Sequence, residues 1–166
     1  MAKQTCDPYR SGYVRQGVAF AKPGVDIAKG DLICQDATNP HYVVPASEYT
    51  LAAINAAAAA FVGVAQNGRG GSDPERRIVF AYTGDYMYPL DTPAHLNAGA
   101  TLTFDDDGVD LKAQGFKPTA TAAEVIAKVT VTTGHPDIMH NPTVIATANL
   151  GTKDEVQAAI KPALMA

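Results

Sequence analysis

The feature that most constrains this chain is a succession of short β-branched or aromatic runs, each closed by glycine, proline, asparagine or aspartate. Runs of this length and composition are typical of strands, and the closing residues are typical of turns. They lie at residues 17–21, 31–34, 41–44, 61–65, 77–82, 85–88, 100–104, 109–112, 124–131 and 143–147. The sequence therefore predicts a mainly β protein, a small β-barrel or β-sandwich of about ten short strands.

Two segments depart from the strand pattern and predict one or two short helices. Ser47 is placed to cap a helix over residues 48–59, which includes a run of alanines with high helix propensity. Near the end, Thr152 and Glu155 have the spacing of a capping box, which predicts a second helix running through Ile160.

The first residues differ from the rest of the chain in pattern and in charge. Residues 1–16 show no sustained period, so we expect an extended N-terminal arm, followed by a single β-rich domain over residues 17–166. Residues 1–30 carry 5 basic and 2 acidic side chains, a net charge of +3, whereas residues 31–166 carry 8 and 15, a net charge of −7. A basic arm suits an acidic partner, another subunit included, and an acidic body argues against nucleic-acid binding.

A weak internal echo links residues 27–33 with residues 96–102, since both place a glycine two residues before the apolar positions of a strand. Two copies are a small basis for a repeat architecture. We attribute the echo to turns that enter strands and that need glycine for the same backbone reason.

Metal and cofactor sites are not indicated. Cys6 and Cys34 stand 28 residues apart and form no metal knuckle or redox pair. His135 and His140 flank a proline and match neither a helical zinc motif nor a close histidine pair, so we expect exposed loop histidines. We therefore expect no metal and no cofactor.

Catalytic motifs are likewise missing from the sequence. The acidic run 105–108 lacks the ligand spacing of a calcium loop and instead predicts a tight hairpin turn. The glycine-rich run 67–72 lacks the lysine and helix of a P-loop, which indicates a flexible surface loop. No nucleophile motif occurs, so we do not expect an enzyme.

Tyrosines gather at residues 82–88 and leave two interpretations open. Tyr86 and Tyr88 could form a contact surface for carbohydrate or protein, because tyrosine combines apolar area with a hydroxyl group. They could equally be core residues of an alternating strand.

Nothing in the sequence predicts a membrane segment. The longest apolar stretch, residues 56–64, is far shorter than the ~20 residues that a membrane helix needs, and the start has no apolar core like that of a signal peptide. We expect synthesis in the cytoplasm and no membrane partner.

The order of these segments resembles the small β-rich capsid decoration, or cement, proteins of tailed bacteriophages. The resemblance lies in residues 28–33, 61–65, 82–86, 96–102 and 107–108 and in the closing strand near 126–131, and it spans roughly residues 17–148. It implies a non-enzymatic virion protein that binds the outer capsid surface, as a homotrimer, and clamps neighbouring major capsid subunits.

In that setting, the arm would supply main-chain hydrogen bonds by strand addition, and four of its side chains would act as anchors: Tyr9, Arg10, Tyr13 and Arg15. Two alternatives stay open. One is a carbohydrate-binding β-domain or small tail component that uses Tyr86, Tyr88 and the loop 67–73. The other is a hydrolase or isomerase with a site near His135 and His140.

Overall fold

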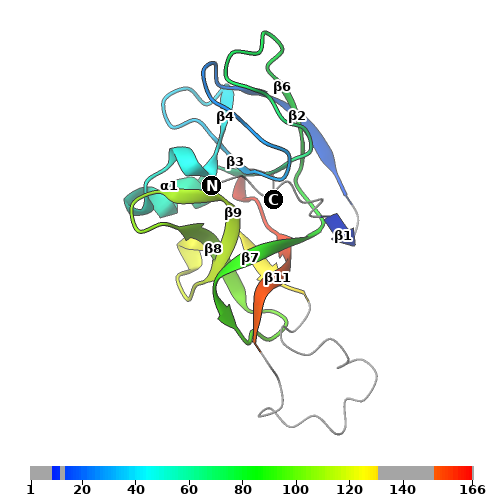
Figure 1. Ribbon diagram of the computed structural model, residues 1–166, viewed down its shortest axis with the longest axis vertical. Helices are drawn as coiled ribbons and strands as arrows, with labels where there is room; N and C mark the ends of the chain where they lie inside the picture. The colour runs from blue at the N-terminus through cyan, green and yellow to red at the C-terminus, as the bar shows by residue number, and fades with distance from the viewer. Residues whose placement is uncertain (1–8, 12–13, 131–151, 166) are drawn as a thin grey trace, which may run out of the picture.

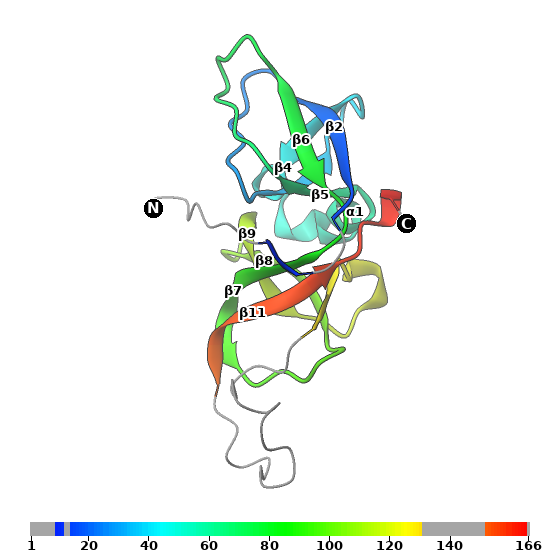
Figure 2. The ribbon, with the colours of Figure 1, turned by 90° about the vertical axis from the view of Figure 1, so that its right-hand side faces the viewer.

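The computed structural model describes residues 9–11, 14–130 and 152–165. Two small closed barrels lie one above the other along the longest axis of the molecule, and both ends of the described chain lie near the junction between them (Figures 1 and 2). The mainly β class predicted from the sequence is therefore confirmed.

The first barrel contains five strands: β2 (Gln16–Ala21), β3 (Leu32–Gln35), β4 (Tyr42–Pro45), β5 (Phe61–Ala65) and β6 (Arg77–Ala81). They close in the order β2-β4-β3-β5-β6. Between β4 and β5 the chain forms two 3₁₀ turns, η1 (Ala46–Glu48) and η2 (Leu51–Ala53), and the short helix α1 (Ile54–Ala59).

The second barrel also contains five strands: β7 (Asp85–Ala94), β8 (Thr101–Asp106), β9 (Leu111–Pro118), β10 (Ala127–Val129) and β11 (Lys153–Ile160). They run in the order β7-β11-β10-β8-β9, and a β7–β9 pairing closes the ring. A 3₁₀ turn, η3 (Ala122–Glu124), lies between β9 and β10, and η5 (Ala163–Met165) follows β11. Strand β1 (Tyr9–Ser11) is added to β7 from outside the ring.

The two barrels have the same topology. The pairs β2–β4 and β7–β9 are parallel, and the other four pairs of each barrel are antiparallel. The registers agree as well, because Ile33 pairs with Pro45 and Gly63, and its counterpart Leu102 pairs with Pro118 and Ala127. The chain is thus an internal duplication of one five-stranded barrel.

The sequence echo is the visible trace of this duplication, so attributing it to turn chemistry alone was wrong. Gly30 and Gly99 occupy the same place and both have positive φ, 89° and 92°. The Gly30 N–H donates to the carbonyl of Ala65 (2.8 Å), and the Gly99 N–H donates to that of Val129 (2.7 Å). The two acceptors are the last residues of the equivalent strands β5 and β10. Two similar turns in unrelated surroundings would not need to share these partners.

Two apolar clusters hold the barrels. The smaller cluster fills the first barrel with side chains that include Ile33, Val43 and Ile78. The larger one combines the interior of the second barrel with the opposite face of β3, β4 and β5 and with α1. The rings of Phe61 and Phe104 meet edge to face, 5.6 Å apart, and join the two barrels.

The strand predictions hold best where apolar runs are compact. The predicted strands from 17–21 to 100–104 coincide with β2 to β8, although β7 runs six residues further, to Ala94. The run 109–112 only begins β9, since the strand continues to Pro118. Of the run 124–131, only Ala127–Val129 forms a strand, β10, and Glu124 ends the turn η3. The predicted strand 143–147 lies outside the described residues.

The first helix prediction is confirmed only over Ile54–Ala59, and the second is wrong. Ser47 lies inside η1 instead of capping a helix, and the α-helix proper starts only at Ile54, with no side-chain cap. The segment predicted as a C-terminal helix is the strand β11, in which Val156, Ala158 and Ile160 are buried in alternation. Pairing with both β7 and β10 outweighs the local preference for a capping box.

Candidate interaction surface

Tyr86 and Tyr88 are core residues. Both lie on β7, where buried and part-exposed positions alternate, and both side chains have no solvent exposure. The Tyr88 hydroxyl donates to the carbonyl of Gly30 in the first barrel (2.5 Å), and the ring of Tyr88 packs edge to face on Phe116. The contact-surface interpretation of these two tyrosines is therefore corrected to a structural one.

The described part of the arm runs along the protein's own body. Tyr9 and Arg10 lie on β1, which pairs antiparallel with β7. Arg15 is exposed, its N–H donates to the Thr83 hydroxyl (2.7 Å), and its carbonyl accepts from Tyr82. Tyr13 lies outside the described residues. The structure therefore does not gather the arm and the tyrosines of β7 into one exposed site.

A different strand presents apolar side chains to solvent. Val18 and Phe20 on β2 are 59% and 53% exposed, and they are two of the four large exposed hydrophobic residues in the described part of the chain. Their neighbours Gly17 and Ala19 point inward, as strand alternation requires. The outer face of β2 is thus apolar over successive outward positions.

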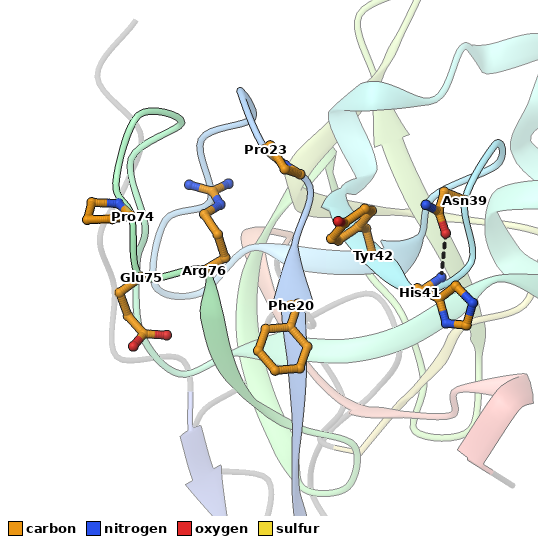
Figure 3. Close-up of a pocket in the computed structure, with 8 residues that line it drawn as sticks. All are labelled: Phe20, Pro23, Asn39, His41, Tyr42, Pro74, Glu75 and Arg76. Atoms are coloured by element: carbon orange, nitrogen blue, oxygen red, sulfur yellow. Dashed lines mark hydrogen bonds between the residues drawn. The ribbon is translucent and has the colours of Figure 1, made fainter.

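Next to Phe20 the surface is hollowed. Figure 3 shows Phe20 between Tyr42 on one side and Arg76 on the other. The pocket has a volume of about 600 Å³ and is lined by rings, prolines and a few polar groups: Phe20, Pro23, Asn39, His41, Tyr42, Pro74, Glu75 and Arg76. Such a mixture of apolar surface with few polar groups is typical of a binding site.

Arg76 forms one wall of this pocket and is held by main-chain carbonyls. Its guanidinium group donates to the carbonyls of Lys22 and Val25 (2.5 and 2.9 Å) and also to that of Gly70. The Gly70 N–H in turn binds the carboxylate of Asp73 (2.7 Å). The loop after β5, which the sequence indicated as flexible, is therefore fastened to the β2–β3 connection.

The strand edge beside the pocket is open. In β2, the odd-numbered residues form the main-chain hydrogen bonds to β6. At one end the Ala21 N–H donates to the carbonyl of Arg76, and at the other the Arg15 carbonyl accepts from the N–H of Tyr82. The main-chain groups of Gln16 and Val18 therefore point to the other side. There β4 pairs only with Phe20 and Ala21, and within the described residues no strand lies beside Gln16–Ala19.

The acidic run 105–108 closes the β8–β9 hairpin, as predicted. Asp107 accepts hydrogen bonds from the N–H groups of Val109 and Asp110, and Asp106 accepts one from Gly108. Asp106 also pairs with Lys117, and this hydrogen bond holds the pKa of Asp106 below its usual value. These carboxylates are used in the turn and its ion pairs.

Other chemical groups are not brought together. Burial raises the pKa of the Cys34 thiol, which lies in the core and donates to the carbonyl of Ala57. Cys6, His135 and His140 lie outside the described residues. Within residues 9–11, 14–130 and 152–165, no three metal-ligating side chains form a group.

The chain matches no known protein-family model and no curated protein sequence. Across the described ranges, no helix is long and apolar enough to cross a membrane.

Sequence reasoning missed this surface although β2 carried a signal. Residues 16, 18 and 20 are large while 17, 19 and 21 are glycine or alanine. Alternation places residues 17, 19 and 21 on one face of the strand and 16, 18 and 20 on the other, and the small residues suit the inner face because the ring of Phe80 already fills that space. This contrast indicates that Val18 and Phe20 lie on the outer face. It could be interpreted only once β2 was known to be part of a closed barrel.

Proposed function

We propose that this protein is a non-enzymatic structural protein of a tailed-phage virion, which binds the outer capsid surface and clamps neighbouring major capsid subunits. The observation that carries the proposal is the open, apolar edge of β2 on a closed, duplicated barrel. A scaffold of this kind suits binding to another protein, because a preformed surface loses little conformational entropy on association. The resemblance of the segment order to cement proteins supplies the choice of partner.

The mechanism follows from linkage. A protein that binds only the assembled shell stabilises it against dissociation, and many copies on one shell add their effects. Assembly as a homotrimer belongs to the same proposal, since three copies around one position would contact three neighbouring subunits. Nucleic acid is not proposed as a partner, because a protein with a net charge of −4 repels the phosphate backbone.

Co-sedimentation tests this proposal. The lysate in which the protein is made is separated by size, and quantitative mass spectrometry follows this chain and the most abundant shell protein. We expect both in the particle fraction at a fixed ratio. If the chain stays entirely in the slow fraction while intact shells sediment, the virion proposal is wrong.

A carbohydrate-binding domain is the second candidate, and one observation favours it. The rings of Phe20 and Tyr42 line an open pocket that also offers the polar groups of Asn39 and His41. Aromatic faces with adjacent polar groups suit a sugar ring. A glycan array on the purified protein tests it: a signal that Phe20→Ala abolishes would favour this function over the first.

A further inference from the structure

We propose that the open edge of β2 receives an extended segment of the shell protein as an added antiparallel strand, and that the pocket beside Phe20 receives one apolar side chain of that segment. The inference rests on the proposed function and specifies its contact. Its parts are the outward main-chain groups of Gln16 and Val18, the exposed face of β2 and the adjoining pocket.

The duplicated barrel indicates what fills such an edge. On β7 the equivalent position is covered by β1, which is antiparallel and pairs Tyr9 with Tyr86 and Ser11 with Asp85. From the common register with β6 and β11, Tyr86 and Asp85 correspond to Gly17 and Gln16. The second barrel therefore already pairs an extended antiparallel strand, β1, at the position that is open in the first barrel.

Within the described residues no segment is left to cover the β2 edge, so the proposal assigns it to another polypeptide. The chain's own β1 is already placed on β7, and β4 leaves the edge after pairing with Phe20. Gln16 and Val18 each turn one N–H and one C=O toward the opening. An extended segment of any sequence satisfies these groups, which gives affinity from its main chain.

The pocket adds selectivity at one end of the edge. Tyr42 pairs with Phe20 across β2 and β4, so the pocket begins where an added strand would meet β4. Pro23 and Pro74 are exposed and contribute apolar surface. A leucine, proline or aromatic side chain of the incoming segment fits this lining, because burial of apolar surface from both sides is favourable.

The experiment uses three variants of the full chain and shells from which the protein has been stripped. Val18→Pro removes an outward N–H while leaving the ladder to β6 intact, and proline is tolerated at such an edge position. Val18→Ala is the matched control, since it shortens the same exposed side chain but keeps the N–H. Phe20→Ala opens the pocket. Thermal melting verifies that each variant is folded.

The expected result is a separation of the two substitutions at position 18. Val18→Ala binds stripped shells within about twofold of the unchanged protein, whereas Val18→Pro and Phe20→Ala each bind about tenfold more weakly. Hydrogen exchange gives an independent readout, since the peptide covering residues 16–21 becomes protected on the shell.

The outcomes distinguish this inference from the function on which it rests. If the unchanged protein binds stripped shells and Val18→Pro binds equally well, the β2 edge is not the contact, although the virion function stands. If the unchanged protein does not bind shells at all, both fall. A purified protein that dimerises in solution, with dimers that Val18→Pro abolishes, would assign the edge to a second copy and overturn the inference.

Discussion

Gly17 shows how the two barrels fill the same interior position with different side chains. A Cβ at Gly17 would lie 2.6 Å from the ring of Phe80, its partner across β2 and β6. In the second barrel the equivalent pair is Tyr86 and Ala158, so the large and small residues have changed places. The same volume is filled from opposite strands.

This exchange gives a prediction for Gly17→Ala. Because Phe80 is buried and its ring occupies the space, we expect the substitution to lower the free energy of unfolding by about 1–3 kcal/mol. A second change, Phe80→Leu, makes room, so the double variant should lose less than the sum of the two single variants. Urea unfolding of the four proteins measures this; additive losses would mean that the two positions do not compete for space.

Cys34 provides a residue-scale test of core rigidity. Burial raises the pKa of its thiol, and only the thiolate reacts quickly with disulfide reagents. In a Cys6→Ser variant, the remaining thiol should stay unlabelled in native buffer and react fully in denaturant. Labelling of the folded protein at the rate of a free thiol would contradict the packing of Cys34 against α1.

At the scale of elements, the β8–β9 hairpin combines a tight turn with two ion pairs. Lys112 lies 2.6 Å from Asp105, and Lys117 binds Asp106. The pKa of Asp106 is lowered mainly by its hydrogen bond to Lys117. A carboxyl group with a lowered pKa in the folded state stabilises that state above its usual pKa, ~3.9, and loses this contribution as the pH falls further.

We predict that substituting Asp106 changes how the free energy of unfolding depends on pH in the acid range. Asp106→Asn should lower the free energy of unfolding at pH 7 by about 1 kcal/mol, and the difference should vanish as the pH falls below ~3.9. Asp110→Asn is the control, because Asp110 is exposed in the same turn. Denaturant unfolding across the pH range measures both; equal curves for the unchanged protein and Asp106→Asn would contradict the ion pair.

The elements also show which parts of the fold the sequence could predict. Compact runs such as Phe61–Ala65 and the Asp-Gly turn at 107–108 carry their own local signal, and both predictions are confirmed. The segment Lys153–Ile160 carried two signals, a capping box and an alternation of apolar residues. The choice between them depends on the partners β7 and β10, which lie far away along the sequence.

At the scale of the whole molecule, the two barrels share one apolar cluster. Phe104 of the second barrel is fully buried, packs on Phe61 of the first and is one of the largest members of that cluster. The candidate site could not be predicted at this scale, since the tyrosines that define a surface in isolation are buried once β7 joins a closed ring. The duplication itself left only a faint echo, because most paired positions differ in side chain.

The shared cluster predicts cooperative unfolding. Phe104→Ala should lower the stability of both barrels together, by about 3–5 kcal/mol, because a cavity opens at their junction. Hydrogen exchange followed separately in β3 and β8 measures the effect, and Val109→Ala, on an exposed side chain, serves as the control. Loss of protection in β8 alone would mean that the barrels unfold independently.

The doubling of the barrel on one chain has a consequence for dilution. Two separate barrels would dissociate as their concentration fell, but covalently joined barrels meet at an effective concentration set by the few residues between Ala81 and Asp85. Their contact is therefore a property of each molecule and does not depend on the number of molecules in solution. A molecule that dissociates from its binding partner into a dilute solution therefore keeps its fold and can bind again.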